Sequence, residues 1–368
     1  MTLAASPPQR VAVVDALRAV ALLPVVVVNW VGYPALPDGG PLSPPAPMDS
    51  ALAQVLSWLL HGLIAGKGIS LLAFLFGYSQ ALSQTARSAS ALEHRRQRLK
   101  RMAILGLLHG CLLYMGDILT TYAACGWLML GWMARTMGEL RVRLRVVVAL
   151  NLLIILLTLV LAQMPISGAT SVSLSAPSPW SVWVMRNMGH YLGTMLMVIV
   201  LGLPLPLLLM TLGLMAGRLR LFSHPRWRPM LARWVRRWWL PALLLNLVGV
   251  SVLWPGLQTG DAYATSRYAI GYLYPTMLLL SVAVPALVMA CHQRPAWLAL
   301  LAPLGRHTLT LYIGSSVLSL LLFSGAGLAW QPGTAVVLAL ALLYWGGGLI
   351  LAHKLGSRRL PLEAWMSR

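Results

Sequence analysis

A histidine and an aspartate lie eight residues apart in one apolar stretch of the chain, at His109 and Asp117. An imidazole beside a carboxylate can act as a general base, because the carboxylate orients the ring and stabilises its protonated form. The hydroxyl or amine of an acyl acceptor would lose its proton to such a base. On a continuous helix the two side chains would point about 80° apart, so the spacing alone does not predict contact. The competing interpretation is structural: Asp117 caps the next helix and His109 hydrogen-bonds a neighbouring helix.

The first apolar stretch contains three further polar side chains, Asp15, Arg18 and Asn29. A charge inside a bilayer costs at least about 2.5–3.5 kcal/mol and therefore needs a partner or a role. Asp15 and Arg18 are three residues apart, so they share a helix face and are predicted to pair. Asn29 follows Arg18 by eleven residues, about three turns, which puts it on the same face. This face is either a structural ion pair that fixes the helix or part of a substrate-binding surface.

Lys67 and Tyr122 are the other candidate substrate-binding residues. Lys67 lies between Gly66 and Gly68, next to flexible backbone, and Tyr122 follows Asp117 in the same hairpin. The Lys67 ammonium could hold an anionic substrate or a lipid phosphate, pair with Asp117, or extend to the membrane surface.

Arginines that flank the apolar stretches are candidates for binding an anionic cofactor such as acyl-CoA. We assign this role to Arg98, Arg101 and Arg306, since a guanidinium binds phosphate well. The simpler interpretation is that these arginines set the orientation of the chain in the membrane. The three cysteines have no metal-ligand spacing, and no nucleotide-binding or metalloprotease motif occurs, so no metal is expected.

Composition identifies the solvent of this chain as lipid. Hydrophobic residues make up 58% of the 368 residues, charged residues make up 10%, and the mean hydropathy is +0.75. A soluble domain carries about 25% charged residues. Long unbroken apolar runs exclude the alternating pattern of a β-barrel, and about 20 residues are needed to cross the bilayer. The sequence predicts an all-α, polytopic helical membrane protein with about ten transmembrane helices.

The basic residues orient these helices. Of 28 Lys and Arg residues, all but Lys67, Arg186 and Arg267 fall on one side of the predicted spans. Lysine and arginine excess marks the cytoplasmic side, so both termini are predicted to be cytoplasmic in a multi-pass protein of the bacterial cytoplasmic (inner) membrane. The net charge of +20 is explained by this bias and by contact with anionic membrane lipids, and no nucleic-acid partner is expected.

We expect one transmembrane domain over residues 1–368, with an outer Pro/Gly-rich loop at 34–50 and cytoplasmic basic loops at 85–101 and 217–237. The apolar segment at 51–64 is predicted to be half-buried or re-entrant, and a single span is predicted from Met188 to Ala216. The expected partners are membrane lipids and a small-molecule or lipid acceptor, with homo-oligomers as an open alternative.

Several blocks of the chain resemble the DUF418 (YeiB-like) family of bacterial membrane proteins. The resemblance is carried by VDALRAVALL at 14–23 with the later Asn29, FLFG at 74–77, LGLLHG at 105–110, GDILTTYA at 116–123, GRHTLTLY at 305–312 and PLE at 361–363. The layout is also similar to that of the broader transmembrane acyltransferases, whose opening helix carries an Asp, an Arg and a later Asn, matched here by Asp15, Arg18 and Asn29.

This wider resemblance implies an enzyme that moves an acyl group from cytoplasmic acyl-CoA to an acceptor at the outer face, with His109 or Asp117 as the base. The alternative function is a transporter or exporter of a small metabolite or lipid. In that case the buried Asp15, His109 and Asp117 would be proton or substrate sites.

Overall fold

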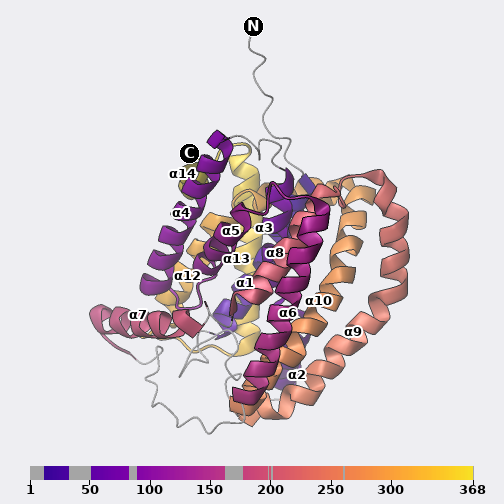
Figure 1. Ribbon diagram of the computed structural model, residues 1–368. Helices are drawn as coiled ribbons and strands as arrows, with labels where there is room; N and C mark the ends of the chain where they lie inside the picture. Colours follow the sequence, from indigo (N-terminus) through magenta and orange to yellow (C-terminus); the bar gives the residue numbers. More distant parts are fainter. Residues whose placement is uncertain are drawn as a thin grey trace.

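The computed structural model describes residues 12–32, 51–82, 89–161, 177–197, 199, 202–259 and 262–367, and these form helices and turns without a strand (Figure 1). The helices are α1 (Ala12–Gly32), α2 (Ala51–Leu63), α3 (Lys67–Leu82), α4 (Ala89–Leu112), α5 (Leu119–Leu130), α6 (Met137–Leu161), α7 (Trp180–Met197), α8 (Pro204–Arg218), η2 (Pro225–Trp227), α9 (Arg228–Thr259), α10 (Ala262–Gln293), α11 (Pro295–Gly305), α12 (Thr308–Phe323), α13 (Thr334–Leu355) and α14 (Pro361–Ser367). The predicted all-α class is confirmed, and the predicted outer loop at 34–50 lies outside the described residues.

The apolar length of these helices is that of a membrane protein. Four described segments are long and apolar enough to cross a bilayer: Ala12–Val31, Ala51–Leu82, Thr276–Gln293 and Thr334–Leu355. Large apolar side chains on α6, α9 and α13 point outward, among them Leu152, Val248 and Leu343. Lipid is the solvent that accepts such an exposed apolar surface.

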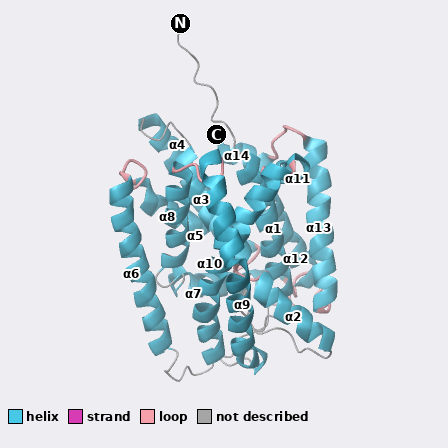
Figure 2. Cartoon of the chain, turned by 90° about the vertical axis from the view of Figure 1, so that its right-hand side faces the viewer, coloured by secondary structure: helices cyan, strands magenta, loops and turns pink. Residues whose placement is uncertain are grey.

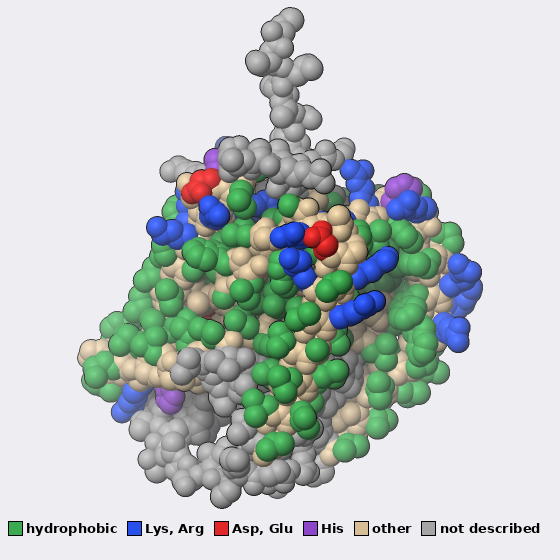
Figure 3. Space-filling model, viewed as in Figure 1, with side chains coloured by type: hydrophobic (Ala, Val, Ile, Leu, Met, Phe, Trp, Pro, Cys, Tyr) green, Lys and Arg blue, Asp and Glu red, His purple; other side chains and the backbone are tan. Residues whose placement is uncertain are grey.

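Lysine and arginine side chains gather at one end of the helix bundle. This basic end carries the starts of α4, α6 and α9 and the end of α13, and Figures 2 and 3 show it at the top, with α14 beside it. The segments at 85–101 and 217–237 were expected to be loops, but much of each is helical, because α4 begins at Ala89 and α9 begins at Arg228. Arginine and lysine have high helix propensity, so α4 and α9 each extend through a basic segment before their apolar part begins.

Helix α2 is a separate, short element, as predicted for residues 51–64. It has 13 residues, about 20 Å of helix, which is less than the hydrocarbon thickness of a bilayer. The chain turns at Gly66, which has a φ of 72° that an amino acid with a side chain rarely adopts.

The single span predicted from Met188 to Ala216 is wrong. Helix α7 ends at Met197 and α8 begins at Pro204, and Figure 1 shows α7 lying across the direction of its neighbours. The reason is the pair Pro204 and Pro206, whose fixed φ and missing N–H suit the first turn of a helix. The Asn151 side chain in α6 fixes this start by donating to the Pro204 carbonyl at 2.9 Å. Helix α11, which was not predicted from the sequence, likewise begins at a proline, Pro295.

Helix α1 forms the centre of the bundle and packs against α3, α11, α12 and α13. Nearly all of its side chains are buried, and those with the least exposure are small or branched. Two indole groups connect α1 to its neighbours. Trp345 of α13 donates to the Ala19 carbonyl of α1 at 2.8 Å, and Trp30 of α1 donates to the Ser315 carbonyl of α12 at 3.0 Å. These bonds fix α13 and α12 against α1.

Helices α3 and α8 pack backbone against backbone through two glycines. A Cβ on Gly77 would lie 1.9 Å from the Met210 carbonyl oxygen, and a Cβ on Gly213 would lie 1.9 Å from the Phe74 carbonyl oxygen. Small residues allow helices in a membrane to pack backbone against backbone.

Replacing Gly213 by alanine should therefore force α3 and α8 apart and destabilise the protein by about 1–3 kcal/mol, the usual effect of overpacking. The measurement is the thermal unfolding temperature in detergent. Gly346→Ala in α13 is the matched control, because a Cβ there meets no atom within 4 Å. An equal loss of stability in both variants would contradict the proposed role of the close crossing.

Candidate active site

His109 and Asp117 are in direct contact. His109 lies in the last turn of α4, which ends at Leu112, and the chain then reverses through residues 113–118. This reversal returns Asp117 to the imidazole, so that His109 Nδ1 lies 2.9 Å from Asp117 Oδ1. Both side chains are fully shielded from solvent. The question that the eight-residue spacing left open is thus answered by the turn.

The Asp117 carboxylate also caps helix α5. Its Oδ1 accepts from the Leu119 N–H at 3.1 Å and its Oδ2 accepts from the Thr120 N–H at 2.8 Å. A carboxylate in this position binds N–H groups that no helical carbonyl reaches and interacts favourably with the helix dipole. Asp117 therefore caps α5, as the structural interpretation predicts, and also contacts His109, as the chemical interpretation requires.

The other imidazole nitrogen faces a serine that sequence reasoning missed. His109 Nε2 lies 2.8 Å from the hydroxyl of Ser316 in α12, which is buried. Because a carboxylate only accepts, Nδ1 carries the hydrogen. Nε2 of the neutral ring then accepts from the Ser316 hydroxyl at 2.8 Å, a shorter contact than the 3.4 Å from that hydroxyl to its other acceptor, the Tyr312 carbonyl. A hydroxyl, an imidazole and a carboxylate thus form one hydrogen-bonded line, the arrangement that activates a nucleophile in many acyl-transfer enzymes. The only sequence signal for Ser316 was a run of serines, Ser315, Ser316 and Ser319, in an apolar helix.

Two tyrosines of the same region surround the imidazole. The ring centroid of Tyr312 lies 4.9 Å from that of His109, and the centroid of Tyr114 lies 6.5 Å from it. The Tyr312 hydroxyl is buried, its oxygen lies in hydrogen-bond range of the Ile118 backbone, and no acceptor for its O–H occurs among the described residues. It is therefore a donor available to a bound group.

Helix α7 closes the site on the side away from the basic end (Figure 1). The Asn187 amide donates to the carbonyls of Gly110 and Cys111, both at 2.8 Å, at the end of α4. The Tyr191 hydroxyl lies 2.9 Å from the Thr120 hydroxyl at the start of α5. Movement of α7 would consequently open the region around His109 and Asp117.

The absence of a side chain at Gly106 in α4 allows the start of α5 to pack against α4. A Cβ at this position would lie 2.5 Å from the Thr120 nitrogen and 2.8 Å from Asp117 Oδ2. A side chain here would displace the carboxylate, which explains the glycine three residues before His109.

The predicted pair of Asp15 and Arg18 is confirmed, with a distance of 2.8 Å between the Arg18 guanidinium and the Asp15 carboxylate. Arg18 also donates to the Ser79 hydroxyl at 2.5 Å, which joins α1 to α3. Asn29 is buried at the other end of α1. In the described ranges no hydrogen bond connects Asn29 or this ion pair to His109 and Asp117, although Trp30, next to Asn29, donates to the carbonyl of Ser315, next to Ser316.

Lys67 and Tyr122 bind backbone carbonyls. The Lys67 ammonium donates to the His61 carbonyl at 3.2 Å, at the end of α2, and the predicted alternative of a Lys67–Asp117 pair is wrong. The reason is that Asp117 is already occupied by His109 and the α5 backbone. The Tyr122 hydroxyl donates to the Ile69 carbonyl at 2.5 Å, which fastens α5 to α3.

The candidate phosphate-binding arginines lie on two different helices. Arg98 is exposed on α4 and Arg306 is exposed just after α11. Arg101 donates to the Trp365 carbonyl at 3.0 Å and thereby binds α14. In the part of the chain that the structure describes, no group of three or more His, Cys, Asp or Glu side chains is placed to hold a metal ion.

Helix α14 connects the two helices that carry the hydroxyl and the imidazole. Glu363 accepts from the Thr310 N–H at 2.9 Å and from the Thr310 hydroxyl at 2.5 Å, so it caps the start of α12. Arg101 binds the same short helix from α4. The two contacts fix α12 relative to α4, and with them Ser316 relative to His109.

Comparison with known families agrees with the resemblance seen in the sequence. Residues 216–360, from the end of α8 through α13, match the family described as "Protein of unknown function (DUF418)". This C-terminal part of the chain therefore resembles DUF418. The matched segment includes Tyr312 and Ser316, whereas His109 and Asp117 precede it. A search of curated proteins found no match.

Replacing Asp117 by alanine should remove the α5 cap and leave the buried Nδ1–H of His109 without an acceptor. Loss of a cap costs about 0.5–2 kcal/mol and a buried unsatisfied donor about 1–3 kcal/mol, so the unfolding temperature in detergent should fall clearly.

Glu139→Ala is the control for this variant, because Glu139 caps α6 by accepting from the Thr136 N–H at 2.7 Å, but at an exposed position. That N–H and the Thr136 hydroxyl lower the pKa of the Glu139 carboxyl. Its removal should have the smaller effect, since water replaces the lost bonds. Equal losses would show that the imidazole does not depend on Asp117.

Proposed function

We propose that this protein is a membrane-embedded acyltransferase that moves an acyl group from acyl-CoA to a hydroxyl or amine acceptor. The observation that supports the proposal is the buried line from the Ser316 hydroxyl through the His109 imidazole to the Asp117 carboxylate, with distances of 2.8 and 2.9 Å. In this line, the Asp117 carboxylate holds Nδ1 of the imidazole, and Nε2 accepts from the Ser316 hydroxyl. An imidazole bound in this way can take a proton during acyl transfer.

In the first step, the Ser316 oxygen attacks the thioester carbonyl and His109 Nε2 takes its proton. The carbon–sulfur bond breaks, and the CoA sulfur leaves with the proton from His109. In the second step, the acceptor oxygen or nitrogen attacks the Ser316 ester, His109 takes the acceptor's proton, and that proton returns to the Ser316 oxygen as the ester bond breaks. Asp117 remains ionised throughout and stabilises the imidazolium.

The Tyr312 hydroxyl is the donor proposed for the carbonyl oxygen that becomes negative in each step. Its hydroxyl is buried beside the imidazole, and its O–H has no acceptor among the described residues. A donor that is already fixed in a dry site stabilises such an oxyanion more than water does.

The proposed orientation places the basic end in the cytoplasm of a bacterial cell, with about ten crossings of the cytoplasmic membrane and both termini inside. Acyl-CoA would arrive at this end, where Arg98, Arg101 and Arg306 are candidates for its phosphates. His109 lies at the far end of α4, so the acceptor would come from the outer face, near Asn29 and α7.

The test is CoA release from acetyl-CoA by the purified protein in lipid nanodiscs, with a panel of amine and hydroxyl acceptors. His109→Ala, Asp117→Asn and Ser316→Ala should each lower acceptor-dependent release by on the order of 10³-fold, the usual effect of removing one member of such a group. His94→Ala, on the exposed N-terminal part of the same helix, should release CoA at the unsubstituted rate.

Peptide mass spectrometry after mixing with acetyl-CoA alone should find the acetyl group on Ser316. Turnover that needs His109 but forms no Ser316 ester would replace the two-step path by direct attack of the acceptor. Absence of both CoA release and acetyl-CoA binding would overturn the proposal for acetyl donors.

A transporter is the second candidate, because a hydrogen-bonded His–Asp pair buried in a membrane bundle is also a suitable proton site. Proteoliposomes that contain a pH-sensitive dye distinguish the two functions. Substrate-driven proton movement that His109→Ala abolishes, in a protein that releases no CoA, would favour transport.

A further inference from the structure

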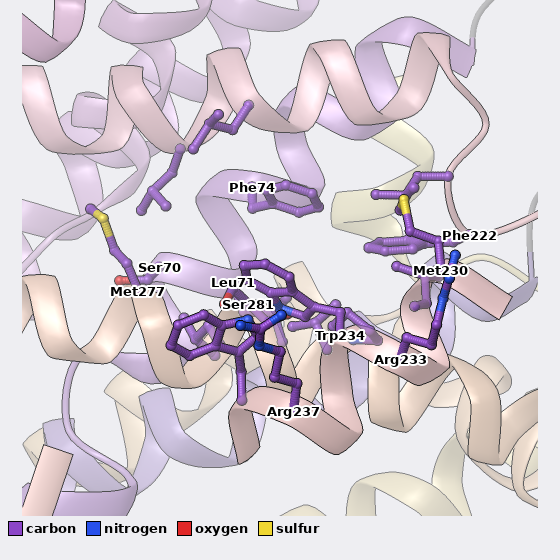
Figure 4. Close-up of a pocket in the computed structure, with 18 residues that line it drawn as sticks. Ser70, Leu71, Phe74, Phe222, Met230, Arg233, Trp234, Arg237, Met277 and Ser281 are labelled. Carbon is purple, nitrogen blue, oxygen red and sulfur yellow. The ribbon is translucent and has the colours of Figure 1, made fainter. Parts of the chain in front are cut away.

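A large cavity lies between helices α3, α8, α9 and α10, apart from the candidate active site (Figure 4). Its volume is about 930 Å³, which is near the upper end of ligand pockets, about 300–1,000 Å³. Most of its wall is aliphatic or aromatic, and Phe74, Leu209, Met277 and Leu280 are typical of the lining. Such a wall suits hydrocarbon chains.

The polar part of the lining consists mainly of two arginines, Arg233 and Arg237. They are four residues apart on α9 and therefore lie on one helix face, and Figure 4 shows both rising from the side of the cavity opposite Phe74. The four ion pairs of the described residues involve neither guanidinium. The cavity thus combines an apolar interior with two cations that have no carboxylate partner among those residues.

The helix that carries the two arginines is fixed by its tryptophans. The Trp234 indole donates to the Ser281 carbonyl of α10 at 3.1 Å, and its ring lies 5.6 Å from that of Trp238. The Arg237 guanidinium lies 5.8 Å from the centroid of the Trp238 ring. Tryptophan prefers the boundary between headgroups and acyl chains, so these contacts place the arginines at headgroup depth.

The cavity borders the part of α9 that faces lipid. Trp239, Leu244 and Val248, which follow the arginines along the helix, all have exposed side chains. The same end of α9 carries the further arginines Arg228 and Arg236, and their positive field attracts anionic headgroups.

From this geometry we infer that the cavity binds an anionic phospholipid. The phosphate is held by Arg233 and Arg237, whose guanidinium groups match phosphate oxygens in pairs of hydrogen bonds. The acyl chains occupy the apolar space between α3 and α10. A free phosphate leaves the apolar half empty, and a zwitterionic lipid brings the cation of its headgroup next to the two guanidinium groups, so an anionic phospholipid is preferred.

Lipid binding is separate from the proposed chemistry. Ser70 and Phe74 of α3 line the cavity, whereas the Ile69 carbonyl and the Phe76 ring of the same helix contact Tyr122. His109, Asp117 and Ser316 are not part of the lining. The lipid site therefore stands whether or not the protein transfers acyl groups.

The experiment is native mass spectrometry of the whole protein in detergent, titrated with phosphatidylglycerol or with phosphatidylcholine of the same acyl chains. The unsubstituted protein should retain phosphatidylglycerol preferentially. The double variant Arg233→Ala/Arg237→Ala should lose this binding by at least about tenfold, because two charge-assisted contacts are removed.

The control is Arg228→Ala/Arg236→Ala, which removes the same charge from the same helix at exposed positions outside the cavity lining. It should bind phosphatidylglycerol as the unsubstituted protein does. Equal loss in the two double variants, or equal binding of both lipids, would overturn the site, because attraction would then come from net charge or apolar area alone. Binding of palmitoyl-CoA, but not of phosphatidylglycerol, that depends on Arg233 and Arg237 would also overturn the assignment to a phospholipid.

Discussion

The region around the candidate active site depends on the carboxylate of Asp117. A carboxylate buried in a membrane protein must find all of its partners inside the chain, because lipid supplies none. Asp117 finds them in the imidazole of His109 and in the backbone of Leu119 and Thr120. These bonds end the turn after α4, begin α5 and fix the ring that faces Ser316. One side chain thus fixes both the start of α5 and the orientation of the imidazole. The geometry of the site therefore depends on the packing of α4 against α5.

The same constraint explains three other charges that are at least partly buried in the described bundle. Lys67 binds the end of α2, Arg101 binds the end of α14, and Glu363 binds the start of α12. Each supplies hydrogen bonds to backbone groups that a helix leaves without an internal partner. Charged residues that sequence reasoning regards as substrate ligands are therefore used by the fold. The arginines of the α9 cavity differ, because their neighbours are apolar side chains and an aromatic ring.

The sequence predicted what depends on composition and on local spacing. Charge content indicated a helical membrane protein, and a separation of three residues was enough for the Asp15–Arg18 pair. It could not predict contacts that depend on where a helix ends. The His109–Asp117 bond exists because α4 stops before Asp117, and its partner Ser316 comes from a helix 207 residues later. Hydropathy also predicts one continuous helix through Pro204, whereas the structure has two helices, α7 and α8. An average over a window of residues does not detect the missing N–H of proline.

Helix α14 has a consequence for the order in which the molecule is assembled. It follows every other described helix, yet it joins α4 to α12 through Arg101 and Glu363. During synthesis, α4 enters the membrane long before α12, and α14 emerges from the ribosome after both. The contacts of α14 can therefore help to hold the hydroxyl and the imidazole in register only after α4 and α12 are both in place. A partly inserted chain would contain Ser316 and His109 without the α14 contacts, so their alignment would depend on their own hydrogen bond alone.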